Sequence, residues 1–405
     1  MSRKNRILVL TADAGFGHRS AANAIVEAIN DKYGDDTECK IINPIDDPRV
    51  PAIIRKPQME YDQTIQNHPE LYQFSYQISD SYSASAVVEN VISQLMVQVF
   101  RDMLIKYQPD VIISTYLLYN IALRRAMTAN RMNIPFLSVI TDLAEVHSLW
   151  FQPGPDKYFV ASDDVRSQAL LHGIPPAKII VTGLPVDHRI ANEKRSKAEI
   201  RRSLGWDPEL TTILAVSSKR VKNFTDKLQA IGSCGYPIQL AVVAGGDTAL
   251  YDQVRSREWQ IPVWPYNFVD NLSEMLPAAD ILATKAGGLI VSEGLACGLP
   301  IILVDAIAGQ ETGNVRYVCD HAAGVEATTP EEISQTLKQW LGNDQNLLKQ
   351  FTHNTKQIGK PMAAYQIALE ARNILLNGMY EWQPINISRR RFVSKRNRIQ
   401  KAINQ

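Results

Sequence analysis

This sequence has few cysteines, no long hydrophobic run and no excess of charge of either sign. Its four cysteines, Cys39, Cys234, Cys297 and Cys319, form no CxxC pair and accompany no histidine cluster at metal spacing. This pattern indicates a reduced, cytosolic protein without structural zinc. No stretch approaches the roughly 18 apolar residues that cross a bilayer, so any membrane contact is expected to be peripheral. The apolar run at residues 7–10 is also too short for a signal-peptide core.

The balanced charge conceals an uneven distribution along the chain. Among 405 residues, 43 are Lys or Arg and 42 are Asp or Glu, which gives a net charge of +1. Seven basic residues and no acidic ones lie at 389–405, so residues 1–388 carry a charge of −6. We expect this basic tail to bind an anionic membrane surface, and a solvated terminus is the alternative. A nucleic-acid partner is not expected, because the body is acidic and Phe392 alone adds an aromatic ring to the basic run.

Short apolar runs alternate with helical patterns through most of the chain, which predicts an α/β fold. The runs lie at residues 7–10, 111–114, 136–140, 158–161, 179–181, 213–216, 240–244, 281–283 and 301–304. Apolar strands between helices predict parallel sheets that are covered on both faces. The runs form two series separated by a polar stretch at 187–195, so we place a domain junction at about residue 188. Ligands of such folds bind beyond the carboxyl ends of the strands.

The loop after the first strand contains two glycines and a histidine. Gly15 and Gly17 permit close approach of a ligand, and the helix predicted from residue 20 to about 32 offers amides that favour an anion. His18 is a candidate general base, because imidazole accepts a proton near neutral pH. Asp13 is a candidate to orient or polarise His18. The alternative is that His18 only caps the helix.

A second loop, after the run at 281–283, combines a lysine with two glycines and several polar side chains. Lys285 and the amides of Gly287 and Gly288 are suited to binding a phosphate. The nearby side chains suited to sugar hydroxyls are Glu293, Gln310, Glu311 and Asn314. A purely structural strand–turn–helix would not need these residues together.

Three parts of the chain resemble glycosyltransferase family 28, and specifically its monogalactosyldiacylglycerol synthases and processive diacylglycerol glycosyltransferases. These parts are residues 13–25, residues 140–151, and a stretch from 268 to 314 in which the matching segments are 268–271, 284–288, 298–300 and 309–314. Residues 182–186 also resemble the interdomain junction of that family, and the resemblance spans about residues 5–345. It implies a GT-B fold, in which two Rossmann-like domains face a cleft.

The resemblance also implies how the chain is divided. We expect an acceptor-binding domain at 1–188 and a UDP-sugar-binding domain at 189–360. A helix at 361–388 is expected to return to the N-terminal domain, and the basic tail follows at 389–405. The amphipathic segment at 87–104 predicts a helix that either covers the sheet or touches lipid.

The activity implied is inverting transfer of galactose or glucose from a UDP-sugar to diacylglycerol, which forms a β-glycosyl diacylglycerol in glycolipid or galactolipid biosynthesis. The sequence does not choose between the two sugars. No metal or cofactor is expected, since no DxD motif is visible. The enzyme is expected to be cytoplasmic and peripheral at the membrane. The alternatives are a related transferase with a polyprenyl-linked or soluble acceptor, and a catalytically impaired protein that binds lipid or nucleotide.

By resemblance, individual residues receive roles. His18 is the expected base, while Lys285 and the amides at Gly287 and Gly288 stabilise the leaving UDP. Glu293 is expected to hold the ribose, and Phe268 to lie beside the uracil. The residues expected to hold the hexose are Gln310, Glu311 and Asn314. The acceptor-side residues expected are Gly15, Gly17, Asp142, His147 and Trp150, although Trp150 and Phe151 are equally compatible with a role in the core.

The chain departs from the family pattern after the run at 213–216. Residues 217–223 contain no glycine, where such enzymes carry a glycine-rich loop near the donor phosphates. We expect the side chains of Ser217 and Lys219 to replace the missing amide contacts. Ile290 also stands where the family commonly has a threonine.

Overall fold

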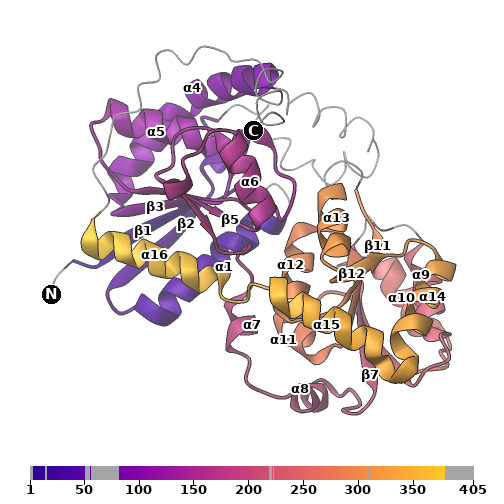
Figure 1. The fold of residues 1–405 in the computed structure, drawn as a ribbon. Helices are drawn as coiled ribbons and strands as arrows, with labels where there is room; N and C mark the ends of the chain where they lie inside the picture. Colours follow the sequence, from indigo (N-terminus) through magenta and orange to yellow (C-terminus); the bar gives the residue numbers. More distant parts are fainter. Residues whose placement is uncertain are drawn as a thin grey trace.

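The computed structural model describes residues 3–13, 16–50, 55, 82–218, 221, 223–307 and 311–378. The chain folds into two α/β units, each built on a six-stranded parallel sheet (Figure 1). The two sheets contain the strands at residues 5–181 and 211–326, respectively. The prediction of a GT-B architecture with two Rossmann-like domains is confirmed.

The first sheet has the strand order β2-β1-β3-β4-β5-β6. Its strands are β1 (Asn5–Leu10), β2 (Thr37–Ile42), β3 (Val111–Ser114), β4 (Phe136–Val139), β5 (Lys157–Val160) and β6 (Ile179–Val181). Among the described residues its helices are α1 (Phe16–Tyr33), α4 (Tyr82–Tyr107), α5 (Asn120–Ala129) and α6 (Asp163–Leu171). Alternate residues of β1 enter different core clusters: Val9 packs with α1, and Leu8 packs with α4 and α5. Because both faces are covered, the central strands are apolar throughout.

The helix predicted at 87–104 lies within α4. Its side chains Met96, Phe100 and Leu104 are buried in the cluster that also contains Leu8 of β1 and Phe136 of β4. The part of α4 whose side chains are described therefore covers the sheet.

The second sheet has the strand order β12-β11-β10-β7-β8-β9. Its strands are β7 (Thr211–Val216), β8 (Ile238–Val243), β9 (Val263–Tyr266), β10 (Ile281–Lys285), β11 (Ile301–Asp305) and β12 (Gly324–Glu326). The helices of this part of the chain are α7 (His188–Asn192), α8 (Lys197–Leu204), α9 (Phe224–Gly232), α10 (Thr248–Ser256), α11 (Leu272–Met275), α12 (Gly288–Ala296), α13 (Thr312–Asp320), α14 (Pro330–Leu341) and α15 (Asn346–Ile358).

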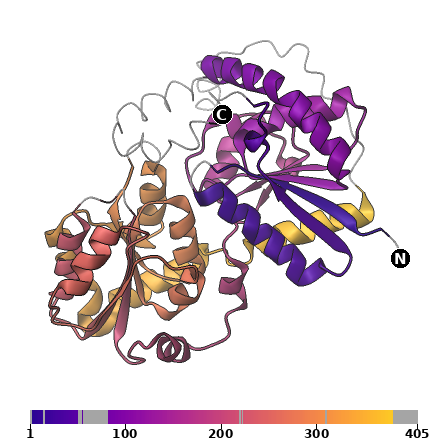
Figure 2. The same ribbon diagram turned by 180° about the vertical axis from the view of Figure 1, so that it is seen from behind.

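The last described helix, α16 (Ala363–Asn377), lies beside α1 in both ribbon views (Figures 1 and 2). Ile367 and Ala371 are buried in the same cluster as Ile25 of α1. The chain thus passes between the two units twice, and the two passages touch. Gly183, at φ +96°, lies so close to Lys360 that a Cβ on the glycine would be 2.3 Å from Cβ of the lysine. A glycine is needed at that position for both its backbone conformation and the close approach.

Three strands lacked a recognised signal in the sequence: β2, β9 and β12. All three lie at an edge of their sheets. Their residues are mostly half-exposed or exposed. Charged residues interrupt β2 and β12, and β9 contains Pro265, which is uncharacteristic of a central strand.

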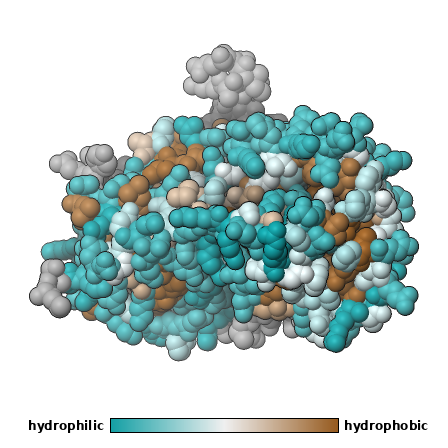
Figure 3. Space-filling model, turned by 90° about the horizontal axis from the view of Figure 1, so that it is seen from below, coloured by the Kyte–Doolittle hydropathy of each residue, from teal (hydrophilic) through white to brown (hydrophobic). Residues whose placement is uncertain are grey.

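The face of the molecule seen from below in Figure 1 is mainly hydrophilic, with separate hydrophobic patches (Figure 3). Within the described part of the chain, no helix has the length and apolar character required to span a membrane.

Candidate active site

His18 is the third residue of α1, and its ring faces the loop that follows β4. Its Nδ1 lies 2.7 Å from Oγ1 of Thr141, and the ring of Tyr116 contacts it edge-on, with centroids 5.1 Å apart. Burial lowers the pKa of His18 to about 4, so the imidazole is neutral at physiological pH. The ring is therefore held by a different strand-end loop, in its neutral form, which is able to accept a proton.

Asp142 follows Thr141 in the same loop. The indole Nε1 of Trp150 donates a hydrogen bond of 2.7 Å to Oδ2 of Asp142, and the Trp150 ring centroid lies 6.1 Å from that of His18. Burial raises the pKa of Asp142 to about 6. The Trp150 side chain thus binds Asp142 through its Nε1 and lies next to the His18 ring.

Three ring side chains of this segment, Trp150, Phe151 and His147, are buried. Trp150 and Phe151 are buried in the cluster around β5, as the core alternative predicts. His147 is buried, and its Nδ1 accepts a hydrogen bond of 3.2 Å from the backbone N–H of Leu149 at the start of a short 3₁₀ helix (Ser148–Phe151). These residues shape the loop that presents Asp142.

Asp13, which the sequence analysis expected to orient His18, forms hydrogen bonds with Arg19 and Asn43. Its two carboxylate oxygens accept hydrogen bonds of 2.8 Å from Arg19, and Asn43 donates a further one of 3.3 Å. The hydrogen bonds from Arg19 lower the pKa of Asp13. In this structure Thr141, which the sequence analysis did not select, holds Nδ1 of His18.

Of the two glycines in the first loop, Gly15 and Gly17, the structure describes Gly17 alone. Gly15 lies outside the described residues. Gly17 borders open space, because a Cβ at this position would meet no atom within 4 Å.

On the second unit, Lys285 ends β10 and forms an ion pair with Glu311, which immediately precedes α13. The other oxygen of Glu311 accepts a hydrogen bond of 2.9 Å from the backbone N–H of Ile307. A Cβ on Gly287 would lie 3.0 Å from Nζ of Lys285, so this glycine leaves room for the ammonium group. The lysine and the glutamate predicted to bind the donor are thus brought together.

The neighbouring helix α12 begins at Gly288, and its first amides are available to an anion. Asn314, on α13, donates a hydrogen bond of 2.9 Å from Nδ2 to the carbonyl oxygen of Ala286. The N-termini of α12 and α13 therefore lie next to each other, with Lys285 and Glu311 at the same place. Gln310 lies outside the described residues.

Glu293 lies on α12 with its carboxyl group enclosed. Burial, with a smaller contribution from the negative charge of Asp187, raises the pKa of Glu293 to about 8. A carboxyl group in this state is protonated in much of the population at neutral pH, and it is able both to donate and to accept hydrogen bonds.

The end of β7 is packed against Gly245, a glycine that the sequence analysis did not select. A Cβ on Gly245, at φ +64°, would lie 2.5 Å from the carbonyl oxygen of Ser217, which is itself buried. The close backbone approach beside β7 is thus made by the loop after β8, and glycine is required there.

Lys219 lies outside the described residues. Phe268 has 65% of its surface exposed and is free of the core.

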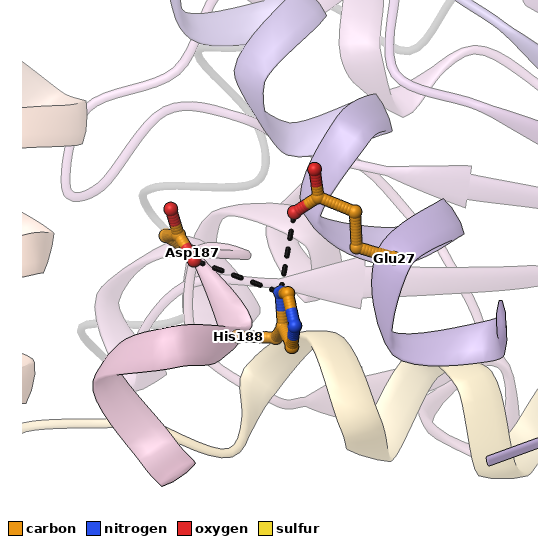
Figure 4. A group of neighbouring side chains, drawn as sticks. All are labelled: Glu27, Asp187 and His188. Atoms are coloured by element: carbon orange, nitrogen blue, oxygen red, sulfur yellow. Dashed lines mark hydrogen bonds and ion pairs between the residues drawn. The ribbon is translucent and has the colours of Figure 1, made fainter. Parts of the chain in front are cut away.

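One group of side chains in the described part of the chain has metal-ligating atoms close together: Glu27 of α1 with Asp187 and His188 at the start of α7 (Figure 4). Nδ1 of His188 lies 3.2 Å from Oε2 of Glu27 and 3.6 Å from Oδ1 of Asp187. Arg189 donates to both oxygens of Asp187, with the shortest contact at 2.6 Å. A cation here would compete with that guanidinium, so we interpret the group as a polar network in which His188 joins α1 to α7.

Two protein families match the chain, one on each unit. Residues 18–186 match the family described as monogalactosyldiacylglycerol (MGDG) synthase, and residues 196–358 match glycosyl transferases group 1. The chain is 32% identical to the chloroplastic monogalactosyldiacylglycerol synthase of Spinacia oleracea, over 89% of this chain and 71% of that protein. It is 30% identical to monogalactosyldiacylglycerol synthase 1 of Arabidopsis thaliana, over 92% of this chain and 72% of that protein.

A likeness to solved structures extends over both units. MurG from Acinetobacter baumannii superposes with a TM-score of 0.58 at 12% identity, covering 91% of this chain and 99% of that chain. At this level of identity the likeness concerns the fold, and it agrees with the two Rossmann-like domains described above.

Proposed function

Because this chain belongs to the monogalactosyldiacylglycerol synthase family, we propose that it transfers galactose from UDP-galactose to the free hydroxyl of diacylglycerol. The chain is a UDP-sugar-dependent glycosyltransferase of the GT-B class. The transfer inverts the configuration at the anomeric carbon and yields a β-galactosyl diacylglycerol, a galactolipid.

The observation that carries the mechanism is the position of a neutral His18 beside Thr141. The acceptor hydroxyl must lose a proton as it attacks the anomeric carbon, and His18 accepts that proton at Nε2. This requires the tautomer in which Nδ1–H donates to Oγ1 of Thr141, 2.7 Å away. A base in this position typically contributes about 10²–10⁴-fold to the rate.

The leaving UDP needs groups that stabilise its negative charge. Lys285 and the amides of Gly287 and Gly288 at the start of α12 supply them, and the amide of Gly287, which donates a hydrogen bond of 2.8 Å to the carbonyl oxygen of Lys285, must be released from it to do so. In the structure Lys285 is paired with Glu311, so binding of the donor requires the lysine to turn from this carboxylate to a phosphate. Glu311 then becomes available to a hydroxyl of the hexose.

Three further donor contacts are proposed. Glu293 holds the ribose hydroxyls, since its carboxyl group is enclosed and can both donate and accept hydrogen bonds. Phe268 lies against the uracil, since its ring is largely exposed and aromatic faces stack on bases. Asn314 contacts the hexose from the start of α13.

The reaction is tested by incubating the full-length chain with UDP-galactose or UDP-glucose and diacylglycerol, followed by thin-layer chromatography of the lipids. We expect monogalactosyl diacylglycerol as the main product. A polyprenyl-linked and a soluble sugar acceptor are included in parallel. Transfer only to one of these, or binding of UDP without release of UDP from either donor, would contradict the proposal.

We also infer that the enzyme works at the surface of an anionic membrane, where a hydrophobic acceptor is collected. The support is the basic tail at 389–405, which lies outside the described residues. Each Lys or Arg near such a surface adds about 1 kcal/mol, so seven give an upper bound of about 7 kcal/mol.

Vesicle sedimentation of the full chain and of a chain that ends at Ser388 tests this inference. The full chain should bind anionic vesicles more strongly, and the difference should shrink as salt is raised. Equal binding of both forms at every salt concentration would remove the tail from the explanation.

A further inference from the structure

The loop that carries Thr141 and Asp142 docks directly on the two helices of the donor unit. Leu143 and Ala144 are buried in one core cluster with residues of that unit, including Val291 on α12. A Cβ on Gly288 would lie 3.9 Å from the backbone nitrogen of Leu143. The contact therefore reaches the first residue of α12.

The same loop makes a closer contact with α13 through Glu145. A Cβ on Gly313, the second residue of α13, would lie 2.7 Å from both Cβ and Cγ of Glu145. Gly313 has ordinary helical geometry, so its backbone conformation does not require glycine. What requires glycine is the approach of the two units, because any side chain would press against Glu145.

One turn further along α13, Arg316 binds the carboxylate end of the same side chain. Its guanidinium lies 2.6 Å from Oε1 of Glu145. The two side chains are 60% and 47% exposed, and an exposed pair of this kind adds little to the stability of the fold. Its distinctive feature is that it connects the two units at one fixed relative position.

This contact joins the two halves of the proposed site. On one side, Thr141 holds His18 four residues before Glu145 in the chain. On the other, Glu311 and Asn314 lie at the N-terminus of α13, on either side of Gly313. The distance between the proposed base and the donor sugar therefore depends on how closely the loop packs on α13.

We propose that Glu145, Gly313 and Arg316 form a docking contact that positions His18 over the donor sugar. They are positioning residues, which act through the relative placement of the two units. The inference rests on the proposed transferase function for its kinetic consequence. A displacement of about 1 Å between reacting groups is able to cost about 10²-fold in rate, so a weak surface contact at this place has a large effect on turnover.

The kinetic test uses Gly313→Ala, the exchange Glu145→Arg with Arg316→Glu, and each single reversal. Gly313→Ala and both single reversals should lower kcat at least about 10-fold, while the affinity for UDP, measured by calorimetry, changes less than about 2-fold. The double exchange restores the opposite charges and should recover most of kcat. Arg257→Ala, an exposed arginine on the same unit that contacts Gln229, is the matched control and should keep the wild-type kcat.

An activity-independent test uses the pair Glu145→Cys and Gly313→Cys, in a chain where Cys319 is replaced by serine. The two Cβ positions are close enough for a disulfide after a shift of about 1 Å, since Cβ atoms of a disulfide lie about 3.8 Å apart. We expect rapid cross-linking on mild oxidation of the pair and none of either single cysteine.

The outcomes separate the two proposals. Wild-type kcat in Gly313→Ala, a double exchange no better than the single reversals, or no disulfide would each overturn the docking contact. Rapid cross-linking in a chain that transfers no sugar to any lipid would leave the contact in place and contradict the proposed function.

Discussion

Oγ1 of Thr141 lies 2.7 Å from Nδ1 of His18, although 123 positions separate the two residues in the sequence. The sheet order explains the contact. His18 follows β1 and Thr141 follows β4, and these two strands lie on either side of β3. All three strands are parallel, so the segments after them emerge at the same edge of the sheet.

Replacing His18 with alanine should lower kcat by about 10²–10⁴-fold, because the proton acceptor is lost. The affinity for UDP should stay within about 2-fold, since the proposed UDP contacts lie on the other unit. Turnover and calorimetry with UDP measure the two effects. His353→Ala, at an exposed position of α15, is the control. Turnover near wild type would exclude His18 as the base.

Replacing Thr141 with valine removes the partner of Nδ1 while keeping the shape of the side chain. A neutral hydrogen bond contributes about 0.5–1.5 kcal/mol, so kcat should fall about 2–12-fold. Thr141→Ser keeps the hydroxyl and should remain close to wild type. If valine and serine behave alike in steady-state kinetics, the hydroxyl does not orient the base.

The ion pair between Lys285 and Glu311 predicts that removing the lysine and removing the glutamate affect UDP affinity differently. Lys285→Ala should weaken UDP binding about 10–100-fold, because a charged hydrogen bond to phosphate is worth about 1.5–3 kcal/mol. Glu311→Ala should leave UDP affinity unchanged or increase it, because Lys285 no longer has to leave the Glu311 carboxylate in order to bind the UDP phosphate. Its kcat should fall, since a proposed hexose contact is lost. Weaker UDP binding in Glu311→Ala would show that the carboxylate assists the phosphate site.

Glu293 predicts a pH dependence of stability with a definite sign. Its pKa is raised to about 8 in the folded chain, so the unfolded chain releases the proton first as pH rises. The free energy of unfolding should therefore fall between about pH 4.5 and pH 8, by at most about 5 kcal/mol from this group.

Glu293→Gln lacks that titration and should be more stable than wild type at pH 8.5, with the gain shrinking toward pH 5. Urea unfolding at the two pH values measures the difference. Glu331→Gln, at an exposed position of α14, is the matched control and should show no such trend. A stability gain that is equal at both pH values would mean that Glu293 ionises normally in the folded chain.

Much of the fold was readable from local patterns, and the strands that were missed lie at the edges of the sheets. The central strands were recognised because burial on both faces demands continuous apolar runs. The edge strands β2 and β12 were missed because charged residues interrupt them, and β9 was missed because it contains a proline. The role of α4 as a cover for the sheet was one of two alternatives, and packing of its described side chains decided it.

The sequence by itself determined which loops form the candidate site, because glycines, His18 and Lys285 stand directly after apolar runs, and such positions lie at the carboxyl ends of parallel strands. Tertiary structure alone decided which side chains contact one another in that site. Asp13, close to His18 in sequence, binds Arg19, while distant Thr141 holds the imidazole. Gly313 meets Glu145 from the other unit. Local patterns report burial and backbone preference, whereas side-chain partners depend on strand order and on the docking of two units, which no local pattern contains.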